Sequence, residues 1–325
     1  MSAIIQDITI FAPAKVNLHL AVKDLRSDGF HNLESIFFSV DFGDTLRFSP
    51  VSNGSKNEIL MEWDDDQAGS AVYNDIFRSI PAENNLIFRA MSLFREKTGY
   101  DRFFKVKVEK RIPPGGGLGG GSSDAAAALL SLNELSGGLL SRGDLLQTAA
   151  SLGSDVPFFI YRTTAALVTG RGECIKPLEA GSLFPVPDTK FPLVLVNPGF
   201  PSPTAAAFRL LDEHRAGKTI TGNRSPQTID VSENTGSLCS SGPLFIQTPQ
   251  SGISRNDFLP VFKDPEKSVY ENIISRLLEN GAVFAGLSGA GSTCFGFFSG
   301  MEQAQKAAQA LRADWPFVKC CSSFP

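Results

Sequence analysis

The residues with the clearest chemical potential form a glycine-rich stretch near the middle of the chain. Six of the seven residues at Gly115–Gly121 are glycine, and Ser122-Ser123-Asp124 then lead into an alanine-rich run at 125–130. Glycine is favoured where backbone approaches a ligand closely or adopts positive φ. The Ser/Asp cluster is typical of a helix N-cap, and alanine is a strong helix former. A loop of amide N–H groups entering a helix N-terminus favours bound anions, so the stretch predicts a phosphate site.

Other interpretations of the glycine-rich stretch fit less well. No Gly-Lys-Ser/Thr follows it, which excludes a Walker A loop. A dinucleotide-binding loop should follow its strand tightly, but Pro113-Pro114 intervene, and the acidic residue about twenty positions on, Glu134, falls near a predicted helix end. A flexible linker would not pass directly into a capped, alanine-rich helix. The phosphate site remains the best interpretation.

Four single residues outside this stretch could contribute chemistry, but each has a plain alternative. Asp155 follows Gly153-Ser154 and precedes a proline by two positions, which suits either a general base or a simple helix N-cap. Lys15 and Lys110 each suit a surface lysine at a strand end. His31 lies in a predicted turn, where a lone histidine is more often structural than catalytic.

The elements that would position these residues mix strands and helices without regular alternation, which favours an α+β fold. In the strand at 16–22, the apolar residues share one face, so Lys15 and Asn17 occupy the other. We expect strands at 8–11, 16–22, 36–40, 45–49, 58–63, 104–108, 164–169, 193–197, 283–287 and 293–298. We expect helices at 84–97, 123–136, 141–152, 204–213, 267–279 and 301–312.

Two domains are expected, 1–178 and 179–325, because a proline-rich stretch begins at Pro177. The segment 214–254 is rich in Ser, Thr, Gly, Pro and Gln with few large apolar residues, so we expect a mobile insertion there.

The bulk composition is that of an ordinary globular protein, with 42% hydrophobic and 20% charged residues among 325. The net charge of −4 argues against a general nucleic-acid binder. No apolar run approaches the length of a membrane span, and the first residues lack a signal-peptide pattern. The five cysteines form no CxxC pair and suit reduced thiols, so we expect a cytoplasmic protein without membrane or nucleic-acid partners.

Three stretches resemble the motifs of the GHMP small-molecule kinases, in the family's order. They are 12–18 (APAKVNL), 113–123 (PPGGGLGGGSS) and 287–296 (LSGAGSTCFG). The stretches 28–35, 153–159 and 197–199 further resemble one group of the family, which phosphorylates a cytidine diphosphate-linked sugar alcohol in the non-mevalonate isoprenoid precursor pathway. The resemblance covers roughly 8–210 and 256–320. It implies a ribosomal protein S5 domain 2-like N-terminal domain that binds ATP and carries out catalysis, and a ferredoxin-like C-terminal domain that binds the substrate. It also implies use of ATP and Mg²⁺.

The resemblance also implies roles for individual residues. Asp155 would be the catalytic base, with Lys15 placed against it and against the acceptor hydroxyl, where a cation favours the carboxylate. The family's nucleotide-binding positions match Asn85, Lys110, Pro113, Pro114, Gly115, Gly116, Gly117, Leu118, Gly119, Gly120, Gly121, Ser122 and Ser123. Either serine could contact phosphate or Mg²⁺, or simply cap the helix. No residue is assigned as a protein ligand of a metal.

On the acceptor side, the resemblance implies that Phe30 stacks on cytosine, that His31 bonds the base edge, and that Phe208 forms the opposite wall. The family usually has Tyr at the position of Phe30, so this chain keeps the aromatic face and lacks the hydroxyl. Asn17, Thr204 and Gly289 match further substrate-binding positions.

Two other functions stay open from the sequence. Another GHMP kinase, such as a homoserine or phosphomevalonate kinase, would share the glycine loop but has no use for the Gly29-Phe30-His31 turn. A non-catalytic nucleotide-binding or RNA-binding relative would not need both Lys15 and Asp155. We expect a monomer or weak homodimer.

Overall fold

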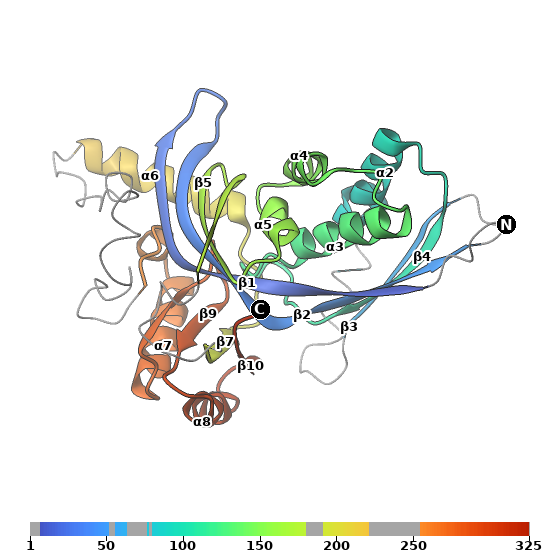
Figure 1. Cartoon of the computed structure of the whole chain (residues 1–325). Helices are drawn as coiled ribbons and strands as arrows, with labels where there is room; N and C mark the ends of the chain where they lie inside the picture. Colours follow the sequence, from blue (N-terminus) through green and yellow to red (C-terminus); the bar gives the residue numbers. More distant parts are fainter. Residues whose placement is uncertain are drawn as a thin grey trace.

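The computed structural model describes residues 7–51, 56–63, 77, 80–179, 191–220 and 254–324. Within them, two sheets lie side by side, each with its own helices (Figure 1). The first sheet comprises β1 (Ile8–Leu25), β2 (His31–Pro50), β3 (Glu58–Trp63), β4 (Phe104–Lys110), β5 (Ala165–Gly170) and β6 (Cys174–Leu178). Its helices are α2 (Leu86–Thr98), α3 (Gly120–Leu135), α4 (Arg142–Leu152) and α5 (Val156–Tyr161), which cover one face in Figure 1.

The second sheet follows the ferredoxin-like order expected from the resemblance. Its strands are β7 (Leu193–Asn197), β8 (Phe284–Leu287), β9 (Cys294–Phe297) and β10 (Phe317–Cys321), and all neighbouring strands are antiparallel. The spatial order β10-β7-β9-β8 is that of a split βαβ fold. Its helices are α6 (Thr204–Ile220), α7 (Glu266–Glu279) and α8 (Met301–Leu311). The α+β class is confirmed.

The strands β1 and β2 form one long hairpin, which corrects the four short strands expected there. Pro13 and Gly43 read as strand ends in the sequence, but they face each other at a β-bulge inside the hairpin. A side chain at Gly43 would place its Cβ 2.2 Å from the Ala12 carbonyl oxygen, so only glycine lets the strands stay paired. The hairpin is therefore continuous through the middle of the molecule.

Both faces of this hairpin are buried. Val16 and Leu18 belong to an apolar core shared with the second sheet, and Phe37 packs in the core under the helices of the first sheet. Strand alternation alone suggests that the face of β1 with Lys15 and Asn17 meets solvent. In the structure it does not, since both residues are 3% exposed. Lys15 lies against the Phe37 ring and the glycine-rich loop, and Asn17 lies against Ser288, so these neighbours enclose the two polar residues on this face.

Two edge strands were missed and one helix is longer than expected. β6 and β10 are short, partly exposed strands without clear alternation, which is the weakest strand signal in a sequence. α6 continues through Ile220 rather than ending at 213. The predicted insertion at 214–254 therefore begins inside this helix, and its residues 221–253 lie outside the described chain. The predicted domain boundary at 178 coincides with the last residue of β6.

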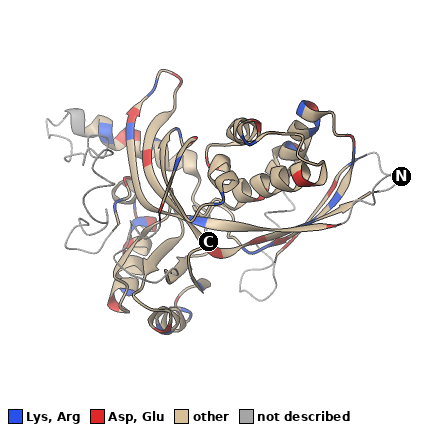
Figure 2. Ribbon diagram, in the orientation of Figure 1, with Lys and Arg blue, Asp and Glu red and all other residues tan. Residues whose placement is uncertain are grey.

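Charged residues of both signs are interspersed along the described chain (Figure 2). Among the described helices, none is long and apolar enough to cross a bilayer.

Candidate active site

The glycine-rich stretch forms a loop between β4 and α3. Gly115, Gly117 and Gly119 have φ of +65°, +74° and +73°, conformations that favour glycine. Gly119 is the N-cap of α3 and makes no side-chain cap bond. The predicted Ser/Asp cap is thus wrong: Ser122-Ser123-Asp124 lie within the first turns of the helix, which begins earlier because glycines can start it without a side-chain cap.

The carbonyl oxygens of the loop are hydrogen-bonded to other parts of the protein. Four consecutive carbonyl oxygens, those of Gly115 to Leu118, accept hydrogen bonds from Ser202 N, Thr293 N, Ser288 Oγ and Lys15 N at 2.9, 3.1, 2.9 and 3.0 Å, respectively. The Gly116 N–H donates to the Pro113 carbonyl at 3.3 Å. Since the carbonyl acceptors are satisfied by protein, the loop offers its other amide N–H groups to a ligand. The first turn of α3 adds N–H groups without intrahelical partners. The arrangement fits an anion.

A cleft of about 460 Å³ lies in front of this loop. It brings together most of the site residues that the sequence singled out, from both halves of the chain. The predicted residues that line it are Lys15, Asn17, Asn85, Lys110, Pro113, Pro114, Gly115, Gly116, Gly117, Leu118, Gly119, Gly120, Gly121, Ser122, Asp155, Thr204, Phe208 and Gly289.

Three predicted residues do not line this cleft. Ser123 is 1% exposed and borders a separate small cavity of about 10 Å³ behind the loop. His31 is buried next to Phe208, and Phe30 is 54% exposed at the hairpin tip. The Arg171 guanidinium lies 5.3 Å from the centroid of the Phe30 ring.

Lys15 and Asp155 face each other across the cleft. The Lys15 Nζ lies 3.6 Å from an Asp155 carboxylate oxygen and donates to Asn17 Oδ1 at 2.7 Å. It also sits 4.7 Å from the centroid of the Phe37 ring. Burial lowers the pKa of Lys15, and the Asp155 carboxylate partly offsets that effect. Asp155 occupies the N-cap position of α5 but makes no side-chain cap bond, so its carboxylate contacts Lys15 rather than capping the helix.

Asn17 is held in a fixed orientation. Its Nδ2 donates to Ser35 Oγ at 2.9 Å, and that hydroxyl donates in turn to the His19 carbonyl. Its backbone N–H donates to Ser288 Oγ at 3.3 Å, the same hydroxyl that bonds the glycine loop at Gly117. Asn17 therefore links the Lys15–Asp155 pair to the loop.

Lys110 is not the exposed lysine that the sequence allowed. It is 3% exposed and forms ion pairs with Asp44 and Asp124, the latter at 2.6 Å. Burial by itself would lower the pKa of Lys110, but the two carboxylates outweigh it and raise that pKa. Asp44 also accepts the backbone N–H groups of Arg111 and Ile112 at 2.6 and 2.9 Å, which fixes the end of β4 where the loop begins.

Asp44 and Asp124 are partners of Lys110 that sequence reasoning missed. Asp124 lines the cleft, and burial raises its pKa. Its Oδ1 is buried without a hydrogen-bond partner among the described residues. Asp124 resembles a helix cap in the sequence because it follows two serines. In the structure it lies four residues past Gly120, inside the helix.

Asn85 combines a structural and a site position. Its Oδ1 accepts the Ile87 N–H at 2.9 Å and caps α2, and the residue also lines the cleft. The sequence predicts that Asn84 or Asn85 caps this helix, and the structure has Asn85 as the cap with the helix starting at Leu86.

Comparison with known proteins assigns the fold and the motifs to one family. The family models described as GHMP kinases N terminal domain and GHMP kinases C terminal match residues 85–163 and 256–316. The chain is 34% identical to the 4-diphosphocytidyl-2-C-methyl-D-erythritol kinase of Thermodesulfovibrio yellowstonii, over 95% of each chain. It is 34% identical to the chloroplastic kinase of the same name from Arabidopsis thaliana, over 90% of this chain and 68% of that protein.

Solved structures agree with this assignment. A crystal structure of 4-(cytidine 5'-diphospho)-2C-methyl-D-erythritol kinase is 29% identical, with a TM-score of 0.71, and the match covers 98% of this chain and all of that one. Homoserine kinase from Cytophaga hutchinsonii, at 20% identity and a TM-score of 0.65 over 99% and 96% of the two chains, shares the fold. The chain belongs to the GHMP kinase family, alongside the relatives named as 4-diphosphocytidyl-2-C-methyl-D-erythritol kinases.

Proposed function

We propose that this protein transfers the γ-phosphoryl group of ATP to the 2-hydroxyl of 4-diphosphocytidyl-2-C-methyl-D-erythritol, with Asp155 as the base. The observation that carries the proposal is the Lys15–Asp155 pair, 3.6 Å apart in the cleft that the glycine loop borders. The identity to kinases of that name supports the choice of substrate.

In the reaction, the acceptor oxygen bonds to the γ-phosphorus, and the bond from that phosphorus to the bridging oxygen of ADP breaks. Asp155 accepts the proton of the hydroxyl. Lys15, fixed by Asn17 Oδ1 at 2.7 Å, stabilises negative charge on the attacking and transferred oxygens. The amide N–H groups of the loop hold the phosphates in line, so catalysis relies on positioning and charge stabilisation.

The residues beside the loop fit Mg²⁺. Mg²⁺ prefers oxygen ligands and takes one or two protein oxygens plus phosphate oxygens, and it would supply charge neutralisation on the nucleotide. Asp124 Oδ1 is buried without a hydrogen-bond partner among the described residues, and Ser122 lines the same cleft. These two side chains would hold the ion. Lys110, paired with Asp124, would keep that carboxylate in place and border the adenine and ribose side with Asn85.

The acceptor would enter from the hairpin and α6 side of the cleft. Thr204 and Phe208 of α6 and Gly289 line this part. The His31 ring lies parallel to Phe208, with centroids 5.4 Å apart and an interplanar angle of 16°. Cytosine would bind against this aromatic pair and the exposed Phe30, since stacking on an aromatic contributes about 1–3 kcal/mol per base.

The experiment that tests the substrate is phosphorus NMR of purified protein with ATP, Mg²⁺ and a panel of acceptor alcohols. A new phosphomonoester signal should form with the cytidine diphosphate-linked methylerythritol and not with homoserine or phosphomevalonate. Free cytidine diphosphate should compete. Turnover of homoserine without competition by cytidine diphosphate would assign another GHMP kinase activity instead.

We further propose that the protein acts in the cytoplasm as a monomer or weak homodimer, on a small molecule and not on nucleic acid or membranes. The net charge of −4 and the interspersed charges support the exclusion of a nucleic-acid partner (Figure 2). Sedimentation equilibrium measures the oligomeric state directly.

A further inference from the structure

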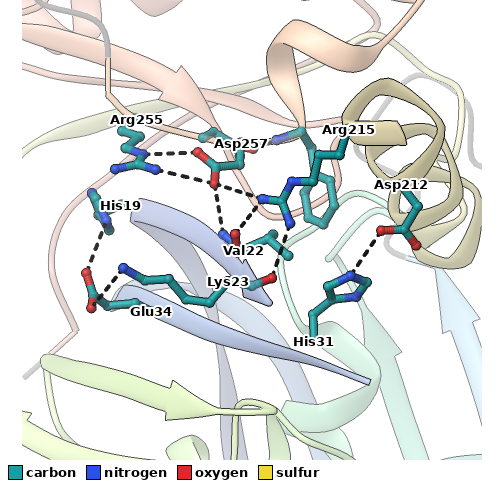
Figure 3. A network of polar contacts seen from close by, with 11 residues as sticks. His19, Val22, Lys23, His31, Glu34, Asp212, Arg215, Arg255 and Asp257 are labelled. Atoms are coloured by element: carbon teal, nitrogen blue, oxygen red, sulfur yellow. Dashed lines mark hydrogen bonds and ion pairs between the residues drawn. The ribbon is translucent and has the colours of Figure 1, made fainter. Parts of the chain in front are cut away.

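Helix α6 contacts both strands near the tip of the β1–β2 hairpin through the side chains of Asp212 and Arg215 (Figure 3). Arg215 donates to the carbonyl oxygens of Val22 and Lys23 at 2.6 and 3.1 Å. One turn earlier, Asp212 contacts His31, the first residue of β2. The two strands of the hairpin are thus tied to the same helix by different residues. The acceptor end of the cleft is consequently built from both halves of the chain.

The contact between His31 and Asp212 fixes the imidazole ring. Nε2 lies 3.0 Å from Asp212 Oδ1, and the ring packs parallel to Phe208, one turn before Asp212 on α6. The His31 side chain is 6% exposed, whereas that of Asp212 is 50% exposed. A buried ring held by one stacking contact and one polar contact has little freedom to rotate.

The same contact decides which nitrogen carries the proton. A carboxylate only accepts hydrogen bonds, so the Nε2 facing Asp212 must be the protonated nitrogen. In the neutral ring, Nδ1 is then left with a lone pair and acts as an acceptor. Among the residues that the structure describes, none donates a hydrogen bond to this Nδ1. The ring therefore presents an acceptor to whatever binds beside it.

We infer that Asp212 is a specificity-determining positioning residue, which makes His31 select a base edge that presents an amino group. This inference rests on the proposed function, in which a pyrimidine diphosphate binds next to His31. Cytosine presents an exocyclic amine that donates to Nδ1, whereas uracil presents a carbonyl oxygen at the same place. Two acceptors facing each other leave both unpaired, which binding sites penalise strongly. Asp212 thereby determines preference for cytidine over uridine without touching the base.

The first test measures the tautomer itself. The chain has three histidines, so the ring nitrogens of His31 can be assigned by nitrogen-15 NMR with single His→Gln variants at the other two. In the wild type, His31 should show a protonated Nε2 and an unprotonated Nδ1 at pH 8. Asp212→Ala should give a mixture of tautomers. The control Glu213→Gln, which removes one negative charge from the neighbouring exposed position of α6, should leave the pattern unchanged.

The second test measures selectivity by calorimetric titration of cytidine diphosphate and uridine diphosphate. The wild type and Glu213→Gln should bind the cytidine nucleotide about tenfold to a hundredfold more tightly. Asp212→Ala should bring that ratio below about threefold, and Asp212→Asn, whose amide oxygen still accepts from Nε2, should restore most of it. Equal wild-type affinities, a preference for uridine, or an unchanged ratio in Asp212→Ala would each overturn the role of Asp212. Wild-type protein that binds an ATP analogue but neither pyrimidine nucleotide would instead refute the proposed function.

Discussion

Replacing Asp155 with Asn separates the two roles that the sequence allowed for this residue. As the base, Asp155 should contribute about 10²–10⁴-fold to turnover, which corresponds to about 3–5 kcal/mol of transition-state stabilisation. As a helix cap it would contribute nothing to turnover. The absence of a side-chain cap bond and the 3.6 Å contact with Lys15 favour the first role. We therefore expect kcat to fall at least a hundredfold while the KM for ATP changes less than about threefold.

The stability of the same variant should fall only moderately. The Asp155 side chain is 32% exposed, but Lys15 is 4% exposed and loses its carboxylate partner, so we expect a loss of about 1–3 kcal/mol. Lys15 keeps its hydrogen bond to Asn17 Oδ1. Steady-state kinetics with a coupled ADP assay and urea unfolding at pH 7.5 measure both quantities on one preparation.

A second variant serves as the matched control. Ser141 caps α4 by accepting the Asp144 N–H at 3.2 Å, so Ser141→Ala should lower stability by about 0.5–2 kcal/mol and leave kcat unaltered. That result would show that a loss of this size does not by itself reduce turnover. Near-normal kcat in Asp155→Asn would refute the assignment of the base.

Three further predictions concern the loop, the buried charges and pH. Gly117→Ala should raise the KM for ATP at least tenfold in kinetic assays, because the new Cβ would lie 2.1 Å from a backbone carbonyl oxygen of the third motif in a residue with φ of +74°. Lys110→Met should cost about 3–5 kcal/mol in urea unfolding, since it leaves Asp44 and Asp124 buried without their cation. His19 has a pKa lowered from 6.5 to about 4 by burial, followed by the nearby Arg255 charge, so its neutral form is favoured in the folded state. Its contribution to stability is complete above pH 6.5 and is lost as the pH falls toward 4, by about 3 kcal/mol in chemical unfolding measured across that range.

Each of these has an outcome that would contradict it. Gly121→Ala is the loop control, because its Cβ would meet only a Leu86 methyl at 3.6 Å, and equal effects at both glycines would argue against the steric reason. The stability lost in Lys110→Met relative to the wild type should shrink as the pH is lowered from 7 to 5, because the buried Asp124 carboxylate without its cation favours the protonated form; a loss that grows would contradict the reasoning. His19→Gln should remove its share of the acid dependence, and an unaltered pH profile would show that other groups are responsible.

The location of the candidate site could be predicted from the sequence because its residues lie in short motifs. The glycine loop, Lys15 and Asp155 were all identified from local patterns and from the family resemblance, and the structure places all of them around one cleft. Backbone requirements such as positive φ are local, so they leave a direct mark on residue type. The α+β class could be predicted because the residue patterns of strands and helices are also local, and they give the order of the elements.

Partners made by packing could not be predicted. Asp44 and Asp124 pair with Lys110 only because β2 and α3 pack against the end of β4, a relation that no spacing in the chain expresses. Asp212 likewise resembled any polar residue of a surface helix until the fold placed it against His31. The hairpin was divided into short strands because Pro13 suggests a strand end, whereas pairing with Gly43 accommodates it as a bulge.

The hydrogen bonds that hold the glycine loop have a consequence for how the protein is made. Of the four groups that bond its carbonyl oxygens, three come from Ser202, Ser288 and Thr293, and the Ser288 hydroxyl is 171 residues further along the chain than Gly117. During translation, the glycines leave the ribosome long before these donors exist. The loop is therefore completed only after Thr293 has been synthesised, and a nascent chain ending after β6 should not yet hold ATP.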